Sequence, residues 1–279
     1  MAAPAAQFAA PGGEAGAAVL AQDIDLWLLQ RIEDSSLNAS EPPQQRRLDG
    51  WIVRTCPGKA KRARSVQPVA LGQRSVQSKL IECEALFREA GLPLVVRLTP
   101  FTQPPDLDAR LARLGWTMFD PTRVMVRAAL GGDAAQTRLR PGWTETAQGP
   151  QEFARIIGAL RGSSAVEIAA HAQRLQHSPV PYTGLVWRDA AGTVQACGQC
   201  AREADLVGLY DIFTAPAARG QGLAGSLCAR LLDLAQQQGA RTAYLQVDAA
   251  NAAARKVYAR LGFRDAYAYH YRSSEAGAH

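Results

Sequence analysis

A glycine-rich segment near the end of the sequence has the residue types needed to bind a phosphate. It lies between an apolar run typical of a strand and a leucine pattern typical of a helix, and it reads Arg219, Gly220, Gln221, Gly222, Leu223, Ala224, Gly225. Glycines at a helix start leave consecutive backbone N–H groups uncovered, and the positive end of the helix dipole favours an anion there. The segment therefore predicts a binding loop for a phosphate or a diphosphate.

The same residues also match the G-x-G-x-x-G pattern of dinucleotide-binding proteins, with Asp248 in the place of the acid that holds a ribose. Two observations argue against that interpretation. In a dinucleotide fold the first glycine directly follows its strand, whereas residues 215–219 intervene here. The stretch after Asp248 is also too short to supply the remaining strands of a doubly wound sheet. We therefore interpret the match as a coincidence.

The residues downstream favour a different kind of site. They follow the pattern L-x-V-x-x-x-N-x-x-A-x-x-x-Y-x-x-x-G-F from Leu245 to Phe263. Together with R-x-x-G-x-A at Arg219, which a strand and Pro216 precede, this pattern resembles the acetyl-CoA motif of the GNAT superfamily of N-acetyltransferases. The resemblance implies acetyl-CoA as co-substrate, no metal, and transfer of an acetyl group to a primary amine by direct attack.

The resemblance also implies roles for individual residues. Residues 219–225 would cradle the diphosphate of CoA, and Ile212, Phe213 and Thr214 would offer backbone groups to the pantetheine arm where two strands splay apart. One N–H of this stretch would also face the thioester carbonyl, where a hydrogen bond stabilises the oxyanion that forms on attack. Asn251 would lie against the cofactor arm, although its position equally suits a helix N-cap.

Tyr258 is the candidate general acid. A tyrosine, with a pKa of about 10, can protonate the departing CoA thiolate, whose thiol has a pKa of roughly 8.5; the alternative is a tyrosine that only fills the core. The general base stays open. Some members of the superfamily carry a glutamate where this sequence has Gly208, so we consider Asp211 first, with Glu203 and Asp205 as alternatives.

The order of elements around the loop recurs in the first half of the sequence. In both halves a strand with a proline precedes a helix that stops at a glycine, and a second strand and helix end at a glycine followed by an aromatic residue; these glycines are Gly91, Gly115, Gly239 and Gly262. We therefore predict an α/β protein with a mixed sheet, built from two GNAT-like domains in tandem. The expected segments are a disordered tail (1–20), a degenerate domain (21–128), a linker (129–137) and a catalytic domain (138–274).

The copy of the loop in the first half is altered. Opposite residues 219–222 it has Leu71, Gly72, Gln73 and Arg74. A side chain in the place of the second glycine would keep a diphosphate away from the backbone. We therefore expect the first half to keep the shape of the domain without its binding site.

The composition is that of a globular protein, with 47% hydrophobic residues, 20% charged residues and a formal net charge of +6. Positive charge is concentrated in residues 50–81, which contain no acid and hold Arg54, Lys59, Lys61, Arg62, Arg64, Arg74 and Lys79. Such a run is usually a solvated face, and otherwise attracts an acidic or phosphate-bearing ligand. Nucleic acid is disfavoured as a partner, because no aromatic reader motif accompanies the charge.

Five scattered cysteines form no disulfide framework, and the C-x-x-C of Cys197 and Cys200 lies in a strand-like segment without further zinc ligands. We therefore expect core cysteines and no metal. No secretory signal or membrane span is recognisable, so we expect a cytoplasmic protein without a membrane partner, as a monomer or a homodimer.

The leading hypothesis is an acetyl-CoA-dependent N-acetyltransferase acting on a small-molecule or peptide amine. The basic stretch suggests that this acceptor carries an acidic group. The first alternative is a non-catalytic acyl-CoA-binding sensor or interaction module. The second is a nicotinamide-dependent oxidoreductase.

Overall fold

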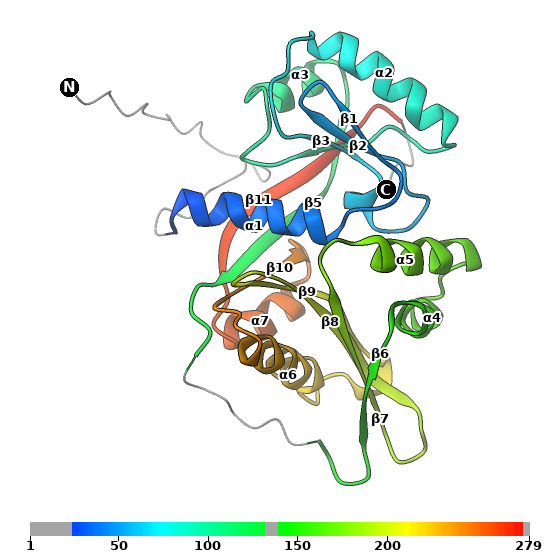
Figure 1. The fold of residues 1–279 in the computed structure, drawn as a ribbon, viewed down its shortest axis with the longest axis vertical. Helices are drawn as coiled ribbons and strands as arrows, with labels where there is room; N and C mark the ends of the chain where they lie inside the picture. The colour runs from blue at the N-terminus through cyan, green and yellow to red at the C-terminus, as the bar shows by residue number, and fades with distance from the viewer. Residues whose placement is uncertain (1–23, 132–138, 276–279) are drawn as a thin grey trace, which may run out of the picture.

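One mixed β-sheet of eleven strands runs through residues 24–131 and 139–275, the part of the chain that the computed structural model describes (Figure 1). Its strand order is β1-β2-β3-β4-β11-β5-β10-β9-β8-β7-β6. The strands are β1 (Gln45–Leu48), β2 (Trp51–Arg54), β3 (Val66–Pro68), β4 (Val96–Leu98), β5 (Thr117–Arg127), β6 (Thr144–Gln148), β7 (Tyr182–Arg188), β8 (Val194–Glu203), β9 (Leu206–Thr214), β10 (Thr242–Asp248) and β11 (Arg264–Ser273).

Helices cover both faces of this sheet, and they are α1 (Leu26–Ala39), α2 (Val76–Glu89), α3 (Leu107–Arg113), α4 (Pro150–Leu160), α5 (Ala165–His177), α6 (Leu223–Gln237) and α7 (Ala252–Arg260). Consecutive residues of a strand point to opposite faces. On β10, Leu245 packs with α6, whereas Tyr244 packs with α1. Cys197 on β8 packs with α4 and α5, and Val96 on β4 packs with α2 and α3. Helices α1, α4 and α5 therefore share one face, and α2, α3, α6 and α7 share the other.

Local sequence explains where the helices begin. Ser164 and Glu167 form a capping box at the start of α5, in which each side chain accepts a hydrogen bond from the other residue's backbone N–H. In α6, Leu223, Leu227 and Leu231 recur on one buried stripe, as the spacing predicts. The capping box thus fixes where α5 begins, and the leucine stripe fixes which side of α6 packs on the sheet.

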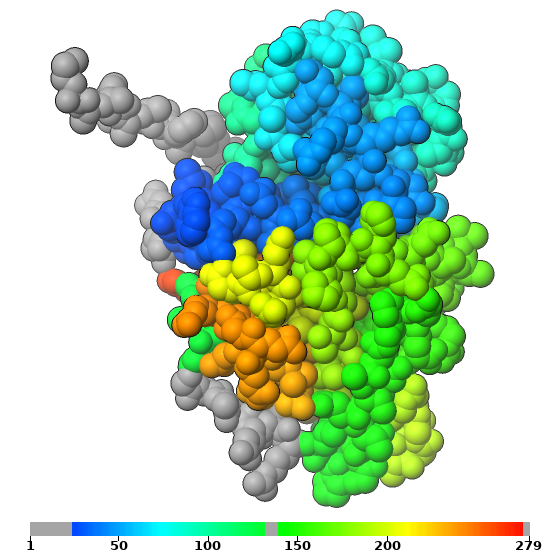
Figure 2. All heavy atoms as spheres, in the orientation of Figure 1, coloured from blue at the N-terminus to red at the C-terminus, as the bar shows by residue number. Residues whose placement is uncertain are grey.

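Two strands are exchanged between the halves of the chain. β5, which comes from the first half, lies between β10 and β11 of the second, and β11 in turn lies between β5 and β4. A buried ion pair adds to this connection, since Glu33 on α1 binds Arg97 on β4 and accepts a hydrogen bond from Tyr267 on β11 at 2.7 Å. In Figure 2 residues of α1 form a band between the atoms of the two halves.

The predicted fold class, an α/β protein with a mixed sheet, is confirmed, and the strands and helices on both sides of each loop follow the expected order. The sequence analysis did not anticipate the exchange of β5 and β11. The expected boundary at 129–137 consequently divides the sequence but not the sheet. The expected tail (1–20) and residues 132–137 of the expected linker lie outside the described residues.

The two cysteines of the C-x-x-C motif lie in β8, and both are buried. Cys197 packs with the cluster under α4, and Cys200 packs with the cluster under α6. Their side chains thus lie on opposite faces of the sheet, which confirms the interpretation as core residues. Within the described residues, no helix combines the length and apolar character needed to cross a membrane.

Candidate functional site

The glycine-rich loop forms the start of α6. Gly220 and Gly222 have φ angles of 75° and 80°, in the region that favours glycine, and Gly222 is the N-cap of the helix. A Cβ atom added to either glycine would meet no heavy atom within 4 Å. Glycine is therefore needed here for backbone conformation, and the space beside the loop is open.

The backbone donors of this loop are unused. No hydrogen bond with another described residue has the N–H of residues 220–225 as its donor, and the first helical bond runs from Ser226 N to Gly222 O at 3.1 Å. Arg140 steadies the loop by donating to the side-chain oxygen of Gln221 at 2.8 Å. Free N–H groups at a helix start are suited to bind an anion.

β9 and β10 separate at the residues that precede this loop. Their parallel pairing ends where Leu209 lies opposite Leu245, yet β9 continues to Thr214 and β10 to Asp248. Ile212, Phe213 and Thr214, the residues with an implied role in pantetheine binding, lie in the part of β9 that is paired with β8 but not with β10. The side of β9 that faces β10 therefore has free backbone groups where an extended ligand can add hydrogen bonds.

The three residues differ in where their side chains lie. Ile212 packs with the α6 face, and Phe213 packs with the α4 face. A Cβ atom at Gly198 would be 2.6 Å from the Ile212 Cδ1 atom, so the side chain of Ile212 needs a glycine beneath it. Thr214 Oγ1 is buried without a hydrogen-bond partner among the described residues.

Tyr258 lies on α7, close to the start of α6. A Cβ atom at Gly225 would be 3.7 Å from Val257 Cγ1, and the Tyr258 ring meets that of Phe263 edge-on with centroids 6.2 Å apart. Burial, with a smaller contribution from Cys228, raises the pKa of the phenol well above its usual value. No hydrogen bond between described residues involves this hydroxyl, so it keeps a proton that it can donate to a ligand.

Asn251 caps α7. Its side-chain oxygen accepts a hydrogen bond from Ala254 N at 3.0 Å, as an N-cap asparagine does. The residue is exposed, so its amide nitrogen can still reach a ligand. The structure thus shows the capping role and leaves the cofactor role a prediction.

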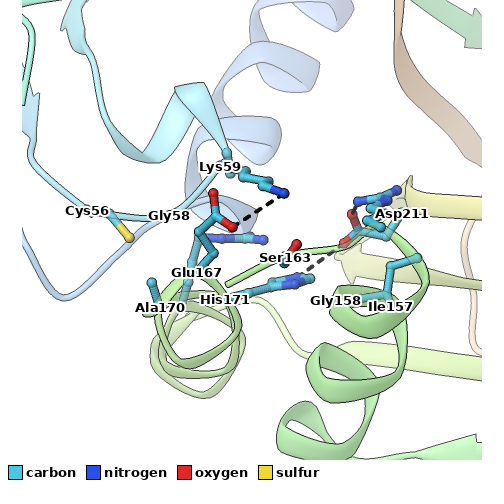
Figure 3. Close-up of a pocket in the computed structure, with 13 residues that line it drawn as sticks. Cys56, Gly58, Lys59, Ile157, Gly158, Ser163, Glu167, Ala170, His171 and Asp211 are labelled. Carbon is cyan, nitrogen blue, oxygen red and sulfur yellow. Dashed lines mark hydrogen bonds and ion pairs between the residues drawn. The ribbon is translucent and has the colours of Figure 1, made fainter. Parts of the chain in front are cut away.

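A bulge in β9 directs Asp211 toward α4 and α5. The register between β8 and β9 shifts between Cys197 and Gln199, and Asp211 has a φ angle of 52°. A bulge re-aims a side chain relative to its neighbours in the strand. The Asp211 carboxylate therefore lines a cavity between α4, α5 and the segment 56–60 (Figure 3).

The Asp211 carboxylate is surrounded by donors. Arg161 donates to it at 2.6 Å, Gln199 donates at 2.7 Å, and Nε2 of His171 lies 3.2 Å away. Burial alone would raise the pKa of Asp211, but the adjacent His171 ring, with the charges of Arg161 and Arg174, holds it far below its usual range. Such a carboxylate is a weak base. It is better suited to orient His171, whose ring also lines the cavity.

The other candidate bases lie elsewhere. Glu203 and Asp205 flank the turn between β8 and β9, at the opposite end of β9 from the bulge, and both bind side chains of α1. A Cβ atom at Gly208 would lie within 2.7 Å of the rings of Tyr210 and Tyr244. The place of a glutamate side chain is thus filled by two tyrosines, whose hydroxyls are 3.0 Å apart.

The cavity beside Asp211 has a volume of about 170 Å³ and is lined by both halves of the chain. The segment 56–60 contributes Lys59, which forms an ion pair of 3.3 Å with Glu167 on α5. Sequence analysis missed His171, Arg161 and Arg174 as site residues, because only the packing of α4 and α5 brings them to the bulge. Among the described residues, no group of His, Cys, Asp and Glu side chains is arranged to hold a metal ion.

The corresponding loop of the first half, at the start of α2, is occupied by the protein itself. The Asp49 carboxylate accepts hydrogen bonds from the backbone N–H of Gln73 at 2.8 Å and of Arg74 at 2.7 Å. These bonds come first among the causes that lower the pKa of Asp49. A Cβ atom at Gly72 would lie only 2.1 Å from the Asp49 backbone oxygen. Asp49 thus occupies two of the backbone donors that an external anion would need at this loop.

Solved structures with this fold include two acetyltransferase-related proteins. The tandem GNAT protein from the clavulanic acid biosynthesis pathway has a TM-score of 0.61 at 15% identity, over 86% of this chain and 88% of that chain. A GCN5-related N-acetyltransferase from Kribbella flavida has a TM-score of 0.55 at 17% identity, over 88% of this chain and 95% of that one. These likenesses establish the GNAT fold.

A family model with the description "Probable histone acetyltransferase Rv0428c C-terminal" matches residues 29–272, from α1 to β11. The chain therefore belongs to this acetyltransferase family of the GNAT superfamily. Mycothiol acetyltransferases of Streptomyces avermitilis and Streptomyces scabiei are 33% and 32% identical over 171 and 174 residues, 54% of this chain. The chain spans about half the length of these curated relatives, 52% in each case.

Proposed function

We propose that the chain is an acetyl-CoA-dependent N-acetyltransferase that moves the acetyl group to a primary amine by direct attack. One observation carries this proposal: the end of β9, whose edge toward β10 is free, is followed after residues 215–219 by the glycine loop, whose N–H groups have no partner among the described residues. In CoA an extended pantetheine arm is joined to a diphosphate, which matches the order of a free strand edge followed by an anion-binding loop. The predicted ligand contacts at residues 212–214 and 219–225, and that of Asn251, are part of this proposal.

The chain's own residues supply the proton transfers. The amine nitrogen attacks the thioester carbonyl, an N–C bond forms, and an N–H on the free edge of β9 stabilises the oxyanion. Collapse breaks the C–S bond, and the Tyr258 hydroxyl protonates the thiolate. The proton lost from the nitrogen passes to His171, which Asp211 orients, so that Asp211 assists the base rather than being the base itself.

We assign one acyl-CoA site to each chain. Two N–H groups of the loop before α2 are bound to Asp49, whereas those of residues 220–225 at the start of α6 have no partner among the described residues. The first half then serves to complete the sheet and to line the acceptor cavity with residues 56–60.

The test is release of free CoA thiol when the purified chain is mixed with acetyl-CoA and a panel of amines. The panel includes a histone peptide and the deacetylated form of mycothiol, because the family description and the similar relatives name those molecules. Amine-dependent thiol release, with an acetyl mass increase on the amine, is the expected result.

Two outcomes would contradict the proposed function and favour another one. Stabilisation by acetyl-CoA in a thermal melt without turnover of any amine would favour a sensor or interaction module. Stabilisation by NAD and none by acetyl-CoA would favour an oxidoreductase.

A further inference from the structure

The cavity beside Asp211 contains a buried guanidinium that forms no ion pair with a described residue. Arg174, on α5, is 7% exposed and lines the cavity. No carboxylate of a described residue lies within ion-pair distance of its side chain, and its charge acts on Asp211 only over a longer distance. Because burial of an unpaired charge is costly, such a group is retained where a ligand can neutralise it.

Further positively charged side chains near Arg174 increase the excess of buried positive charge. Arg54 is 1% exposed and donates hydrogen bonds only to neutral oxygens. Burial lowers the pKa of Arg54 to about 9, and the like charges of Arg62, Arg97 and Arg174 add to the effect against the attraction of Glu41. Arg62 also has a buried Nη1 atom without a partner among the described residues. The protein interior behind the cavity is therefore short of negative charge.

The acids that line the cavity do not correct this shortage, because each already has a cation of its own. Glu167 pairs with Lys59 at 3.3 Å, and Asp211 pairs with Arg161 at 2.6 Å. Of the basic stretch in the sequence, Lys59 lines the cavity, whereas Lys61 is bound to Asp120. The positively charged side chains that line the cavity thus come from both halves of the chain.

We propose that this cavity binds the acceptor through an anionic group, a carboxylate or a phosphate, that pairs with Arg174. The inference rests on the proposed function, since it assigns the acceptor of the same reaction. Asp211 lines the same cavity and precedes Ile212, the first residue of the proposed thioester contact. An acceptor held at Arg174 can therefore extend its amine toward His171 and the acetyl group. The volume of about 170 Å³ restricts the bound part to a small group of atoms.

The first experiment compares matched amines as acceptors: phosphoethanolamine against ethanolamine, and glycine against glycinamide. We expect the anionic member of at least one pair to have the higher kcat/KM, by about tenfold or more, which corresponds to roughly 1.4 kcal/mol. The pair that shows the preference identifies phosphate or carboxylate. In Arg174→Gln the preference should disappear while KM for acetyl-CoA stays unchanged. Turnover of the neutral member at equal or higher efficiency in the wild type would overturn the inference.

The second experiment does not depend on turnover. Thermal unfolding of the full chain is followed in inorganic phosphate, in acetate and in chloride at one ionic strength. The wild type should gain Tm in phosphate or acetate over chloride. Arg174→Gln should gain less, because only the anion site at the start of α6 remains, and Arg174→Lys should lie between the two. The control Arg88→Gln removes the same charge from a side chain on α2 that is 72% exposed, and should keep the full gain.

An equal gain in the wild type and in Arg174→Gln, or none in the wild type, would contradict the inference even if amines are acetylated. Absence of thiol release with every amine would instead contradict the proposed function. The two failures are thereby distinguishable.

Discussion

At the scale of single residues, two glycines with the same backbone conformation allow a sharp test of the binding loop. Gly222 begins α6, and Gly192 lies in the turn between β7 and β8; both have a φ angle of 80°, and neither would place a Cβ atom near another atom. Replacement by alanine costs each about 1 kcal/mol of stability. Any difference between the two variants in ligand binding therefore reports on the loop itself.

We expect Gly222→Ala to raise KM for acetyl-CoA about tenfold or more, because the methyl group stands where the diphosphate must approach the N–H groups. Gly192→Ala should lose similar stability and leave KM unchanged. Steady-state kinetics and thermal melts of both variants check this. Equal KM values for the two variants would exclude residues 219–225 as the diphosphate site.

Tyr258→Phe removes the proposed acid without removing the ring that packs on Phe263. We expect kcat to fall about 100-fold with little change in the Kd of acetyl-CoA. Because the pKa of Tyr258 is raised, the phenol stays protonated as the pH rises through 7 to about 9, so the wild type should not lose turnover through this group in that range. Unchanged kcat in the variant, measured beside calorimetric binding, would remove Tyr258 from the mechanism.

The sequence was sufficient to propose roles for Gly222 and Tyr258, because each belongs to a local pattern on one loop or one helix. It was not sufficient to find His171 and Arg174. They lie on α5, and nothing in their own neighbourhood shows that this helix faces the bulge of β9. The weak basicity of Asp211 was equally hidden, since Arg161 reaches it from another helix.

At the scale of elements, one carboxylate joins helix α3 of the first half to strand β11 of the second. Asp108 accepts hydrogen bonds from His270, at 3.0 Å, and from Arg272. Burial would raise its pKa, but the bonds and charges of His270 and Arg272 lower it to about 2. Since the pKa in the folded state lies below that of the unfolded chain, this contribution to stability is present above pH 4 or so and is lost as the pH falls toward 2.

We expect Asp108→Asn to lower the free energy of unfolding at pH 7 by on the order of 1 kcal/mol, a value discounted because the carboxylate is 44% exposed. The difference from wild type should shrink as the pH is lowered from 7 to 3 in urea titrations. Asp106→Asn is the matched control, because Asp106 precedes the same helix and, among the described residues, forms an ion pair only with the exposed Arg110. If the difference in unfolding free energy between Asp108→Asn and the wild type did not change with pH, the ionised Asp108 carboxylate would not be its source.

At the scale of the whole molecule, the exchange of β5 and β11 makes each half depend on the other. Fragment 139–275 lacks β5, so β10 and β11 would each lose the strand that lies between them. We expect this fragment alone to aggregate and to give no thermal stabilisation with acetyl-CoA. Co-expression with fragment 24–131 should restore a soluble pair that binds acetyl-CoA.

A soluble, acetyl-CoA-binding fragment 139–275 would show that the second half folds independently. The sequence could not reveal this dependence. The repeat correctly placed two strands and two helices in each half. The neighbours of each strand in the sheet, however, are decided by pairings between residues more than a hundred positions apart, such as those of β5 with β10.

The exchanged strands also constrain the order in which the molecule can form during synthesis. β5 leaves the ribosome more than a hundred residues before both of its neighbours in the sheet, β10 and β11. Until then β5 has two unpaired edges, and its apolar residues, among them Val124 and Val126, have no complete core to enter. The first half therefore waits for the last strand, and a translational pause before β11 would leave the nascent chain open to association with other chains.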